Sequence, residues 1–249
     1  MSQQEDNPAI SKNEFENWLI KIFDTNKPPS LRKVASCGAL SKSTLAYQLK
    51  NDAVDPTAVL AIARGMGRNP IKELSSFKQF GSLTQPTDLS ATDTEILYAL
   101  AIPDILREIL RRYSVSVAPF SLSSVSPAQV WGRWFKACAP HVSGKDIQEV
   151  TGISQTSISR NQQLGGWRIE HIFAFSKRFG LHLQIALVTS GFISWEEAGY
   201  SEQTLEERVK NFSSDLLAEC LSSIAPKLPR DIALDQDHRV RNIAVEYLA

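Results

Sequence analysis

The chain lacks most of the features that mark other protein classes. Its 249 residues include 3 cysteines, and Cys37, Cys138 and Cys220 form no CxxC pair. This spacing argues against a disulfide framework and a zinc knuckle. No apolar run approaches the roughly 20 residues that a membrane-spanning helix needs, and the opening MSQQEDNPAI is polar rather than signal-like. We therefore expect a cytoplasmic, nucleoid-associated protein without a membrane partner.

Enzyme signatures are also missing. The sequence has no GxxxxGK loop, no GxSxG elbow, no HExxH pair and no GxGxxG. Its 4 histidines have no metal-ligand spacing with cysteine or acid. The nearest approach to a carboxylate pair is Glu196-Glu197, and we expect these adjacent residues to begin a solvated helix. We predict no enzyme activity, no catalytic residues, no metal and no cofactor.

Charge is balanced overall but unevenly distributed along the chain. The totals are 27 basic and 27 acidic residues, which argues against a protein that coats nucleic acid without selectivity. Residues 12–80 nevertheless hold 11 basic and 6 acidic residues, and residues 127–199 hold 7 and 5. The remaining segments are acidic. Such segregation gives two basic regions that could face phosphates.

The chain contains an internal repeat. A shift of 113 positions places VLAIARGMGRNPIKEL from Val59 on IFAFSKRFGLHLQIAL from Ile172 and keeps the apolar character of the core positions. Further along, at a slightly smaller shift, DILREIL from Asp104 resembles DLLAECL from Asp215. We infer that a unit of roughly 100 residues has been duplicated.

Each copy has the pattern of several short helices. Asp55-Pro56, Asn69-Pro70 and Ser126-Pro127 combine a capping residue with proline at the first helical position, and Gly67 and Gly180 suit left-handed helix ends. Alternation with the period of a strand is missing. We predict an all-α fold of two tandem, diverged helix-turn-helix domains of about five helices each. The predicted ranges are a polar tail 1–11, a first domain 12–80, a helical connector with a Ser-rich linker 81–126, a second domain 127–198 and a C-terminal helical extension 199–249.

The second copy carries the clearer functional motif. In KDIQEVTGISQTSISR from Lys145, a short helix is followed by a turn at Gly152 and by a second helix that Ser154 caps. Apolar residues, among them Ile147 and Ile158, should form a wedge between the two helices. The outward side chains of the second helix can hydrogen-bond base edges and phosphates. These predicted DNA-binding residues are Gln155, Thr156, Ser159, Arg160 and Gln163.

The first copy has the same helix-turn-helix pattern. Ser30 caps one helix, SCGAL forms a turn with about three extra residues, and Ser41 caps KSTLAYQLK with Leu45 and Leu49 facing inward. This outward face suits phosphate contacts with some base contact. The predicted DNA-binding residues here are Lys42, Ser43, Ala46, Tyr47, Gln48 and Lys50.

GISQTSISR around Ser154, LSKSTLAYQL around Ser41, AIARGMGRNPIKEL, AFSKRFG and GFISWEE resemble the lambda-repressor-like helix-turn-helix transcriptional regulators. The likeness is greatest to those of actinobacteria and their phages and prophages. It implies a repressor of the immunity type whose recognition helix enters the major groove of double-stranded DNA. Most such regulators are one-domain dimers, so the tandem arrangement departs from the family pattern.

Two alternatives stay open at this point. A helical protein-interaction adaptor, in which one or both units no longer read DNA, would share these patterns. The tail from Asp235 to Ala249 has one apolar stripe that could fold back on the second copy or form a homodimer contact. The operator, its symmetry and any inducer do not follow from the sequence.

Overall fold

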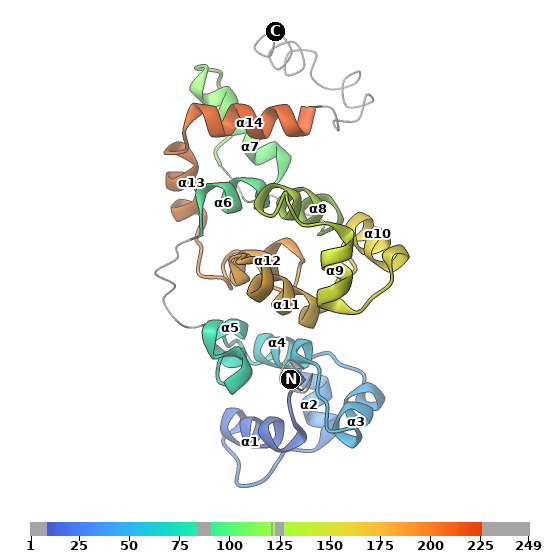
Figure 1. Cartoon of the computed structure of the whole chain (residues 1–249). Helices are drawn as coiled ribbons and strands as arrows, with labels where there is room; N and C mark the ends of the chain where they lie inside the picture. The colour runs from blue at the N-terminus through green and yellow to red at the C-terminus, as the bar shows by residue number, and fades with distance from the viewer. Residues whose placement is uncertain (1–8, 84–90, 121, 123–126, 226–249) are drawn as a thin grey trace.

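The computed structural model describes residues 9–83, 91–120, 122 and 127–225. In these parts the chain forms α-helices, one 3-10 helix (η1) and a single isolated bridge between Ile10 and Val54, so the predicted all-α class is confirmed (Figure 1). The first helices are α1 Lys12–Phe23, α2 Leu31–Cys37, α3 Lys42–Lys50, α4 Pro56–Gly65, α5 Pro70–Leu74, η1 Lys78–Leu83, α6 Asp93–Ala99 and α7 Ile102–Arg112. They are followed by α8 Pro127–Cys138, α9 Gly144–Thr151, α10 Gln155–Leu164, α11 Ile169–Phe179, α12 Leu183–Thr189, α13 Glu202–Lys210 and α14 Ser214–Ile224.

Local capping explains where these helices begin. The side chains of Ser30 and Asn69 accept backbone N–H bonds from the first turns of α2 and α5, and Asp55 does the same for α4. Pro56 and Pro70 occupy first helical positions, as predicted. The predicted cap Ser126 lies outside the described residues, and α8 begins at Pro127.

The starting residues of the helices repeat with the shift of 113 positions that relates the two copies in the sequence. Four successive helices of the second half begin 113 residues after their counterparts. The pairs of starting residues are Leu31 and Gly144, Lys42 and Gln155, Pro56 and Ile169, and Pro70 and Leu183. The correspondence continues to the last helix of each half, because α14 begins 112 residues after α7 and both are 11 residues long. The repeated unit therefore spans seven helices, α1–α7 and α8–α14.

Packing groups the helices into two bodies, which lie one above the other in Figure 1. The N-terminal body comprises α1 to η1, in which α4 packs on α2 and α5. The C-terminal body comprises α6 to α14, in which α6 packs on α8, α12 and α14. Helices α6 and α7 thus join the second half, although by repeat they belong to the first. Residues 114–120, in the predicted Ser-rich linker, connect two helices of the same body.

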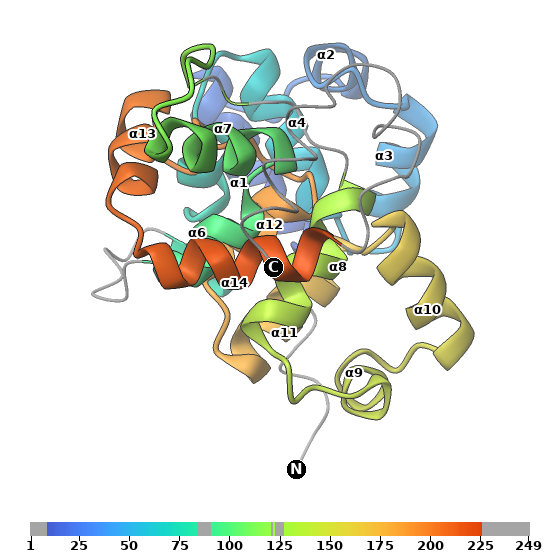
Figure 2. The same ribbon diagram turned by 90° about the horizontal axis from the view of Figure 1, so that it is seen from above.

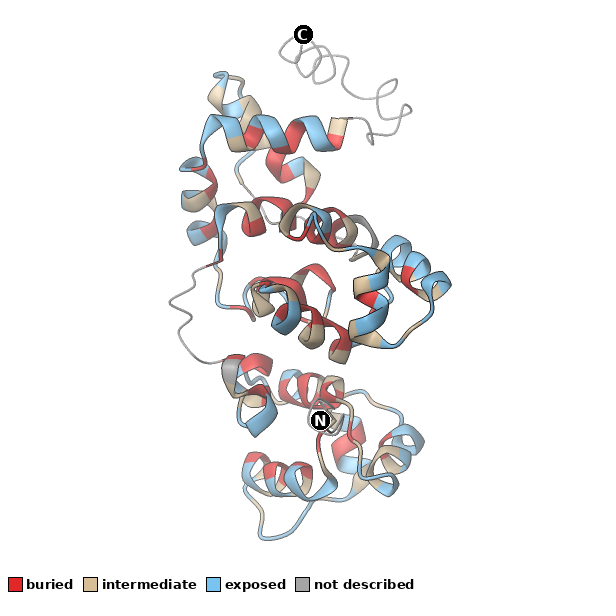
Figure 3. Cartoon of the chain, in the orientation of Figure 1, coloured by how far each residue is buried: buried red, intermediate tan, exposed pale blue. Residues whose placement is uncertain are grey.

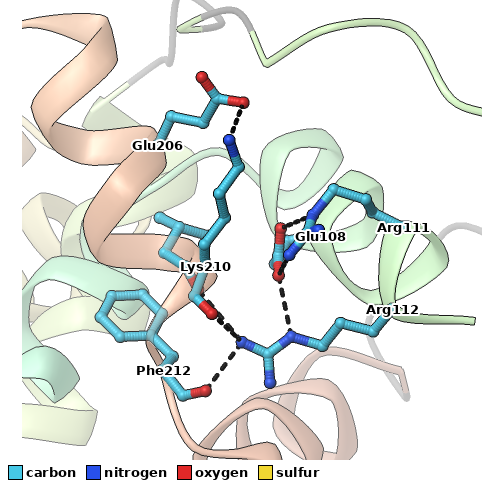
Figure 4. Close-up of polar contacts among 7 residues, drawn as sticks. Glu108, Arg111, Arg112, Glu206, Lys210 and Phe212 are labelled. Atoms are coloured by element: carbon cyan, nitrogen blue, oxygen red, sulfur yellow. Dashed lines mark hydrogen bonds and ion pairs between the residues drawn. The ribbon is translucent and has the colours of Figure 1, made fainter.

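Two arginines tie α6 and α7 into the C-terminal body. Arg133 of α8 is buried and donates to the backbone carbonyls of Tyr98 and Leu100, at the C-terminal end of α6. Arg112 of α7 donates to the carbonyls of Lys210 (3.1 Å) and Phe212 (2.8 Å), at the C-terminal end of α13 (Figure 4). A cation at a helix C-terminus stabilises the unpaired carbonyls there.

Glu108 balances the charge of Arg112. This buried carboxylate accepts hydrogen bonds from Arg111 and Arg112 at 2.7–2.8 Å (Figure 4). Burial by itself raises the pKa of Glu108, but the bonds from the two arginines outweigh it, so the pKa lies below its ordinary value. The carboxylate is therefore held ionised and paired in the folded protein.

Tryptophans lie mainly in the cores. Trp131 and Trp134 are almost fully buried in the C-terminal body, where the ring of Trp131 contacts those of Trp134, Phe135 and Phe175. Trp18 is buried in the N-terminal body, where its Nε1 donates to Glu73 at 3.0 Å. These rings contribute to packing, as their positions on apolar helix stripes predict.

Candidate nucleic-acid interface

The pair α9–α10 forms around one glycine turn and one serine cap. Gly152 ends α9 in the left-handed conformation (φ 68°), which glycine adopts without a steric penalty. Ser154 then caps α10 by accepting the backbone N–H of Ser157 at 3.3 Å. Ile147 and Ile158 are buried between the two helices and their neighbours α8 and α11, so the predicted inward residues are confirmed.

The pair α2–α3 is built in the same way, with a shorter turn than the sequence suggested. Ser36 and Cys37 still belong to α2, so the turn covers residues 38–41, only one residue more than residues 152–154. The prediction of about three extra residues is wrong. The left-handed residue is Ala39 (φ 51°), whereas Gly38 allows close approach, since a Cβ there would lie 3.0 Å from Ile62 Cγ1.

The structure places most of the predicted DNA-binding residues on the surface (Figure 3). On α10 the exposed predicted residues are Gln155, Thr156, Ser159, Arg160 and Gln163. On α3 the exposed predicted residues are Lys42, Ser43, Tyr47 and Lys50. Tyr47 is 69% exposed, whereas its neighbour Leu45 is 1% exposed, so the helix has one outward and one inward face.

Two of the predicted DNA-binding residues are less exposed than the others. Ala46 is half-buried, and Gln48 is half-buried with its Oε1 accepting the backbone N–H of Asp55 at 3.3 Å. This bond joins α3 to the segment that leads into α4. The geometry therefore gives Gln48 a structural partner within the chain and leaves its neighbours Tyr47 and Lys50 to face outward.

The two exposed faces are free of acidic residues. Residues 28–51 contain Arg32, Lys33, Lys42 and Lys50 and neither Asp nor Glu, and α10 contains Arg160 and no acid. Within the described part of the chain, Lys42, Lys50 and Arg160 make no ion pair, and all three are exposed. Unpaired surface cations of this kind attract phosphates.

Both exposed helices lie on one side of the molecule. In Figure 1 α3 and α10 are at the right, in the lower and upper bodies, and after the turn of 90° in Figure 2 they are again at the right. The two helices therefore lie on the same side of the molecule. Sequence reasoning alone could not establish this arrangement.

Sequence reasoning missed the roles of two residues. Glu197 does not simply begin a solvated helix: its carboxylate binds Arg64 of the other body at 2.6–2.7 Å, and its Oε2 accepts the N–H of Ser194. Gln148 of α9 accepts a hydrogen bond from Gln155 at 3.3 Å. Neither partner is marked by a motif, because both contacts depend on how helices pack.

The pKa values of the Glu197 pair follow from this contact. Burial raises the pKa of Glu197, but the hydrogen bonds from Arg64 and from the backbone N–H of Ser194, together with the charge of Arg64, outweigh burial and lower the pKa below its ordinary value. The hydrogen bond with Glu197 raises the pKa of Arg64. Both groups therefore stay charged in the contact between the two bodies.

Among the described residues, His, Cys, Asp and Glu side chains nowhere gather into a group of three that could hold a metal ion. No helix in the described part of the chain is long and apolar enough to cross a membrane. The tail 235–249, with its predicted fold-back or homodimer contact, lies outside the described residues.

A scan against protein-family models and searches of curated proteins and of solved structures found no match to the chain.

Proposed function

We propose that the chain is a sequence-specific, double-stranded DNA-binding transcriptional regulator that acts as a repressor. One observation carries the proposal. Two capped helices, α3 and α10, begin 113 residues apart, carry exposed hydrogen-bonding side chains and lie on one side of the molecule. Each follows a short helix and a tight turn, the arrangement that places a recognition helix in the major groove.

Helix α10 has the side chains for reading bases. A guanidinium such as that of Arg160 can bind O6 and N7 of guanine, and an amide such as that of Gln163 can bind N6 and N7 of adenine. Thr156 and Ser159 supply hydroxyl groups for base edges or phosphates. No acidic residue on α10 opposes the approach of the phosphate backbone.

Helix α3 is better suited to binding phosphates than to reading bases. Lys42 and Lys50 stand near its two ends, and Arg32 and Lys33 of α2 add two further exposed cations. Tyr47 between the lysines offers an exposed ring and hydroxyl. Since the residues of α3 and α10 differ, the proposed operator is asymmetric, with one segment for each helix, and one chain occupies it.

Selection of bound duplexes from a random oligonucleotide pool tests the proposal. We expect enrichment of one asymmetric sequence, and footprinting should show two protected segments on one face of the duplex. The complex with the selected duplex should contain one chain by mass. Affinity should fall steeply with rising salt, because each phosphate contact releases counterions.

The protein-interaction adaptor gives a different result in the same experiment. An adaptor would enrich no sequence, and its duplex binding would be weak and equal for all duplexes. A symmetric palindrome protected by two chains would instead favour a conventional dimer and contradict the tandem arrangement.

A further inference from the structure

The two bodies are joined by a charge pair with fixed geometry. Arg64, near the end of α4, donates from Nε to Glu197 Oε1 at 2.6 Å and from Nη2 to Glu197 Oε2 at 2.7 Å. Such a bidentate pair fixes the orientation of both planar groups as well as their distance. The partners are far apart in the sequence, so their contact depends on how the bodies meet.

Four further contacts join the two bodies, and the first is a hydrogen bond from Arg64 Nη2 to the backbone carbonyl of Phe192 at 2.5 Å. Asn69 Nδ2 donates to the backbone carbonyl of Glu197 at 3.3 Å, next to the ion pair. The rings of Phe80 and Phe173 lie 4.7 Å apart between their centroids, and Phe80 is fully buried. Gln184 Nε2 donates to the carbonyl of Leu83 at 3.0 Å. Contacts at several separate points oppose rotation of one body against the other.

The joined elements lead directly to the candidate reading helices. In the N-terminal body, α4 carries Arg64 and packs on α2, which packs on α3. In the C-terminal body, α11 carries Phe173 and packs on α9, which packs on α10. A change at the contact would therefore alter the separation and relative orientation of α3 and α10.

We propose that Arg64 and Glu197 are positioning residues that hold α3 and α10 in one register, so that the chain recognises only duplexes with one spacing between the two contacted segments. This inference rests on the proposed function and extends it to the geometry of the operator. A flexibly linked pair of units would tolerate several spacings. Two units held rigidly by Arg64 and Glu197 do not tolerate several spacings, because extra base pairs both lengthen the duplex and rotate one contacted segment about the duplex axis.

The test uses the full chain and the selected duplex with 2 or 5 base pairs inserted between its two protected segments. We expect the unmodified protein to lose about 100-fold in affinity on either insertion, since only one helix can then dock. Glu197→Gln and Arg64→Met should bind the original duplex more weakly. Inserting base pairs should lower the affinity of these variants by less than about tenfold. The charge-reversed double variant R64E/E197R should restore part of the spacing preference, because the ion pair can re-form but the bonds from Arg64 to the Phe192 carbonyl and from the Ser194 N–H to Glu197 cannot.

Glu206→Gln is the matched control. It removes an exposed ion pair within α13, between Glu206 and Lys210 at 2.7 Å, and it leaves the contact between the bodies intact. We expect this variant to keep the full spacing dependence. A general loss of charge or stability would affect the control and Glu197→Gln alike, so their difference isolates the positioning role.

A measurement without DNA separates this inference from the proposed function. Spin labels on Asn17→Cys in α1 and Glu149→Cys in α9, both exposed, report the distance between the bodies in a Cys37→Ser background. Cys138 and Cys220 should stay unlabelled, because burial raises their pKa to about 12 and about 11. We expect a narrow distance distribution that Glu197→Gln broadens and R64E/E197R narrows again.

The outcomes are distinct. A protein that enriches no duplex but shows the narrow distribution and its broadening contradicts the proposed function and leaves the positioning role supported. A protein that binds its duplex yet tolerates both insertions, or whose distance distribution Glu197→Gln leaves unchanged, overturns the positioning role.

Discussion

Gln155, the first residue of α10, donates a hydrogen bond from Nε2 to Oε1 of Gln148 in α9 at 3.3 Å. The bond orients an exposed amide at the start of the proposed recognition helix. Gly144, at the start of α9, leaves the space for it, since a Cβ at that position would lie 2.6 Å from Gln155 Oε1. The first residue of α9 therefore controls the position of the first residue of α10.

Gly144→Ala should separate binding from stability. We expect a specific affinity lower by about 1 kcal/mol, because the new methyl group displaces the Gln155 amide from its bond to Gln148. Stability should stay equal or rise by about 0.5 kcal/mol, since alanine favours a helix more than glycine does. Duplex titration and urea unfolding measure the two effects. Equal affinity for the variant and the parent protein would show that Gln155 does not contact a base.

Arg160→Ala and Gln155→Ala should each weaken binding to the selected duplex by about 1–3 kcal/mol without loss of the fold. Both side chains are exposed, so their removal creates no cavity. Gln203→Ala is the control, because Gln203 is an exposed glutamine on α13, outside the predicted set. If all three variants bind like the parent with normal thermal unfolding, α10 is not a reading helix.

Lys42→Ala should act on every duplex alike. If Lys42 contacts a phosphate, affinity falls similarly for specific and unrelated sequences, and the dependence of log K on log salt weakens by about one contact. Lys21→Ala is the comparison, since Lys21 is exposed on α1, which lies at the other side of the N-terminal body from α3 (Figure 1). A fall in specificity with an unchanged salt slope would contradict phosphate contact.

Ile158→Ala and Leu45→Ala should each lower the free energy of unfolding by roughly 2–5 kcal/mol, because both side chains are almost fully buried. DNA binding should be lost through unfolding and should recover at lower temperature. Chemical denaturation followed by circular dichroism gives the stability. Unchanged unfolding curves would mean that the inward and outward faces are assigned the wrong way round.

Acid should weaken the C-terminal body through Glu108. The pKa of Glu108 is lowered by folding, so the stabilisation is complete above the unfolded value of about 4.3 and is lost as the pH falls through the lowered folded value. Glu108→Gln should flatten this part of the stability profile between about pH 5 and 3. Glu219→Gln, at an exposed position of α14, should leave the change of the free energy of unfolding with pH as it is in the parent protein. Equal slopes for the two variants would show that the Glu108 pairing does not contribute.

The sequence by itself determined the local structure of this protein. Helix starts follow from caps such as Asn69 and Ser154, which bond backbone groups only three residues away. The inward positions Leu45 and Ile158 follow from helical periodicity. The repeat of 113 residues in the helix starts follows from comparison of the chain with itself. These features depend on neighbours in the chain, so the residues carry them directly.

Only the tertiary structure decided how the helices are grouped and joined. The association of α6 with α8 and the contact of Arg64 with Glu197 join segments distant in sequence. The turn between α2 and α3 is shorter than predicted for a similar reason. Gly38 lies against Ile62 of α4, and Ala39 adopts the left-handed conformation. Such contacts depend on which surfaces meet when the whole chain packs, and no local residue pattern encodes that choice.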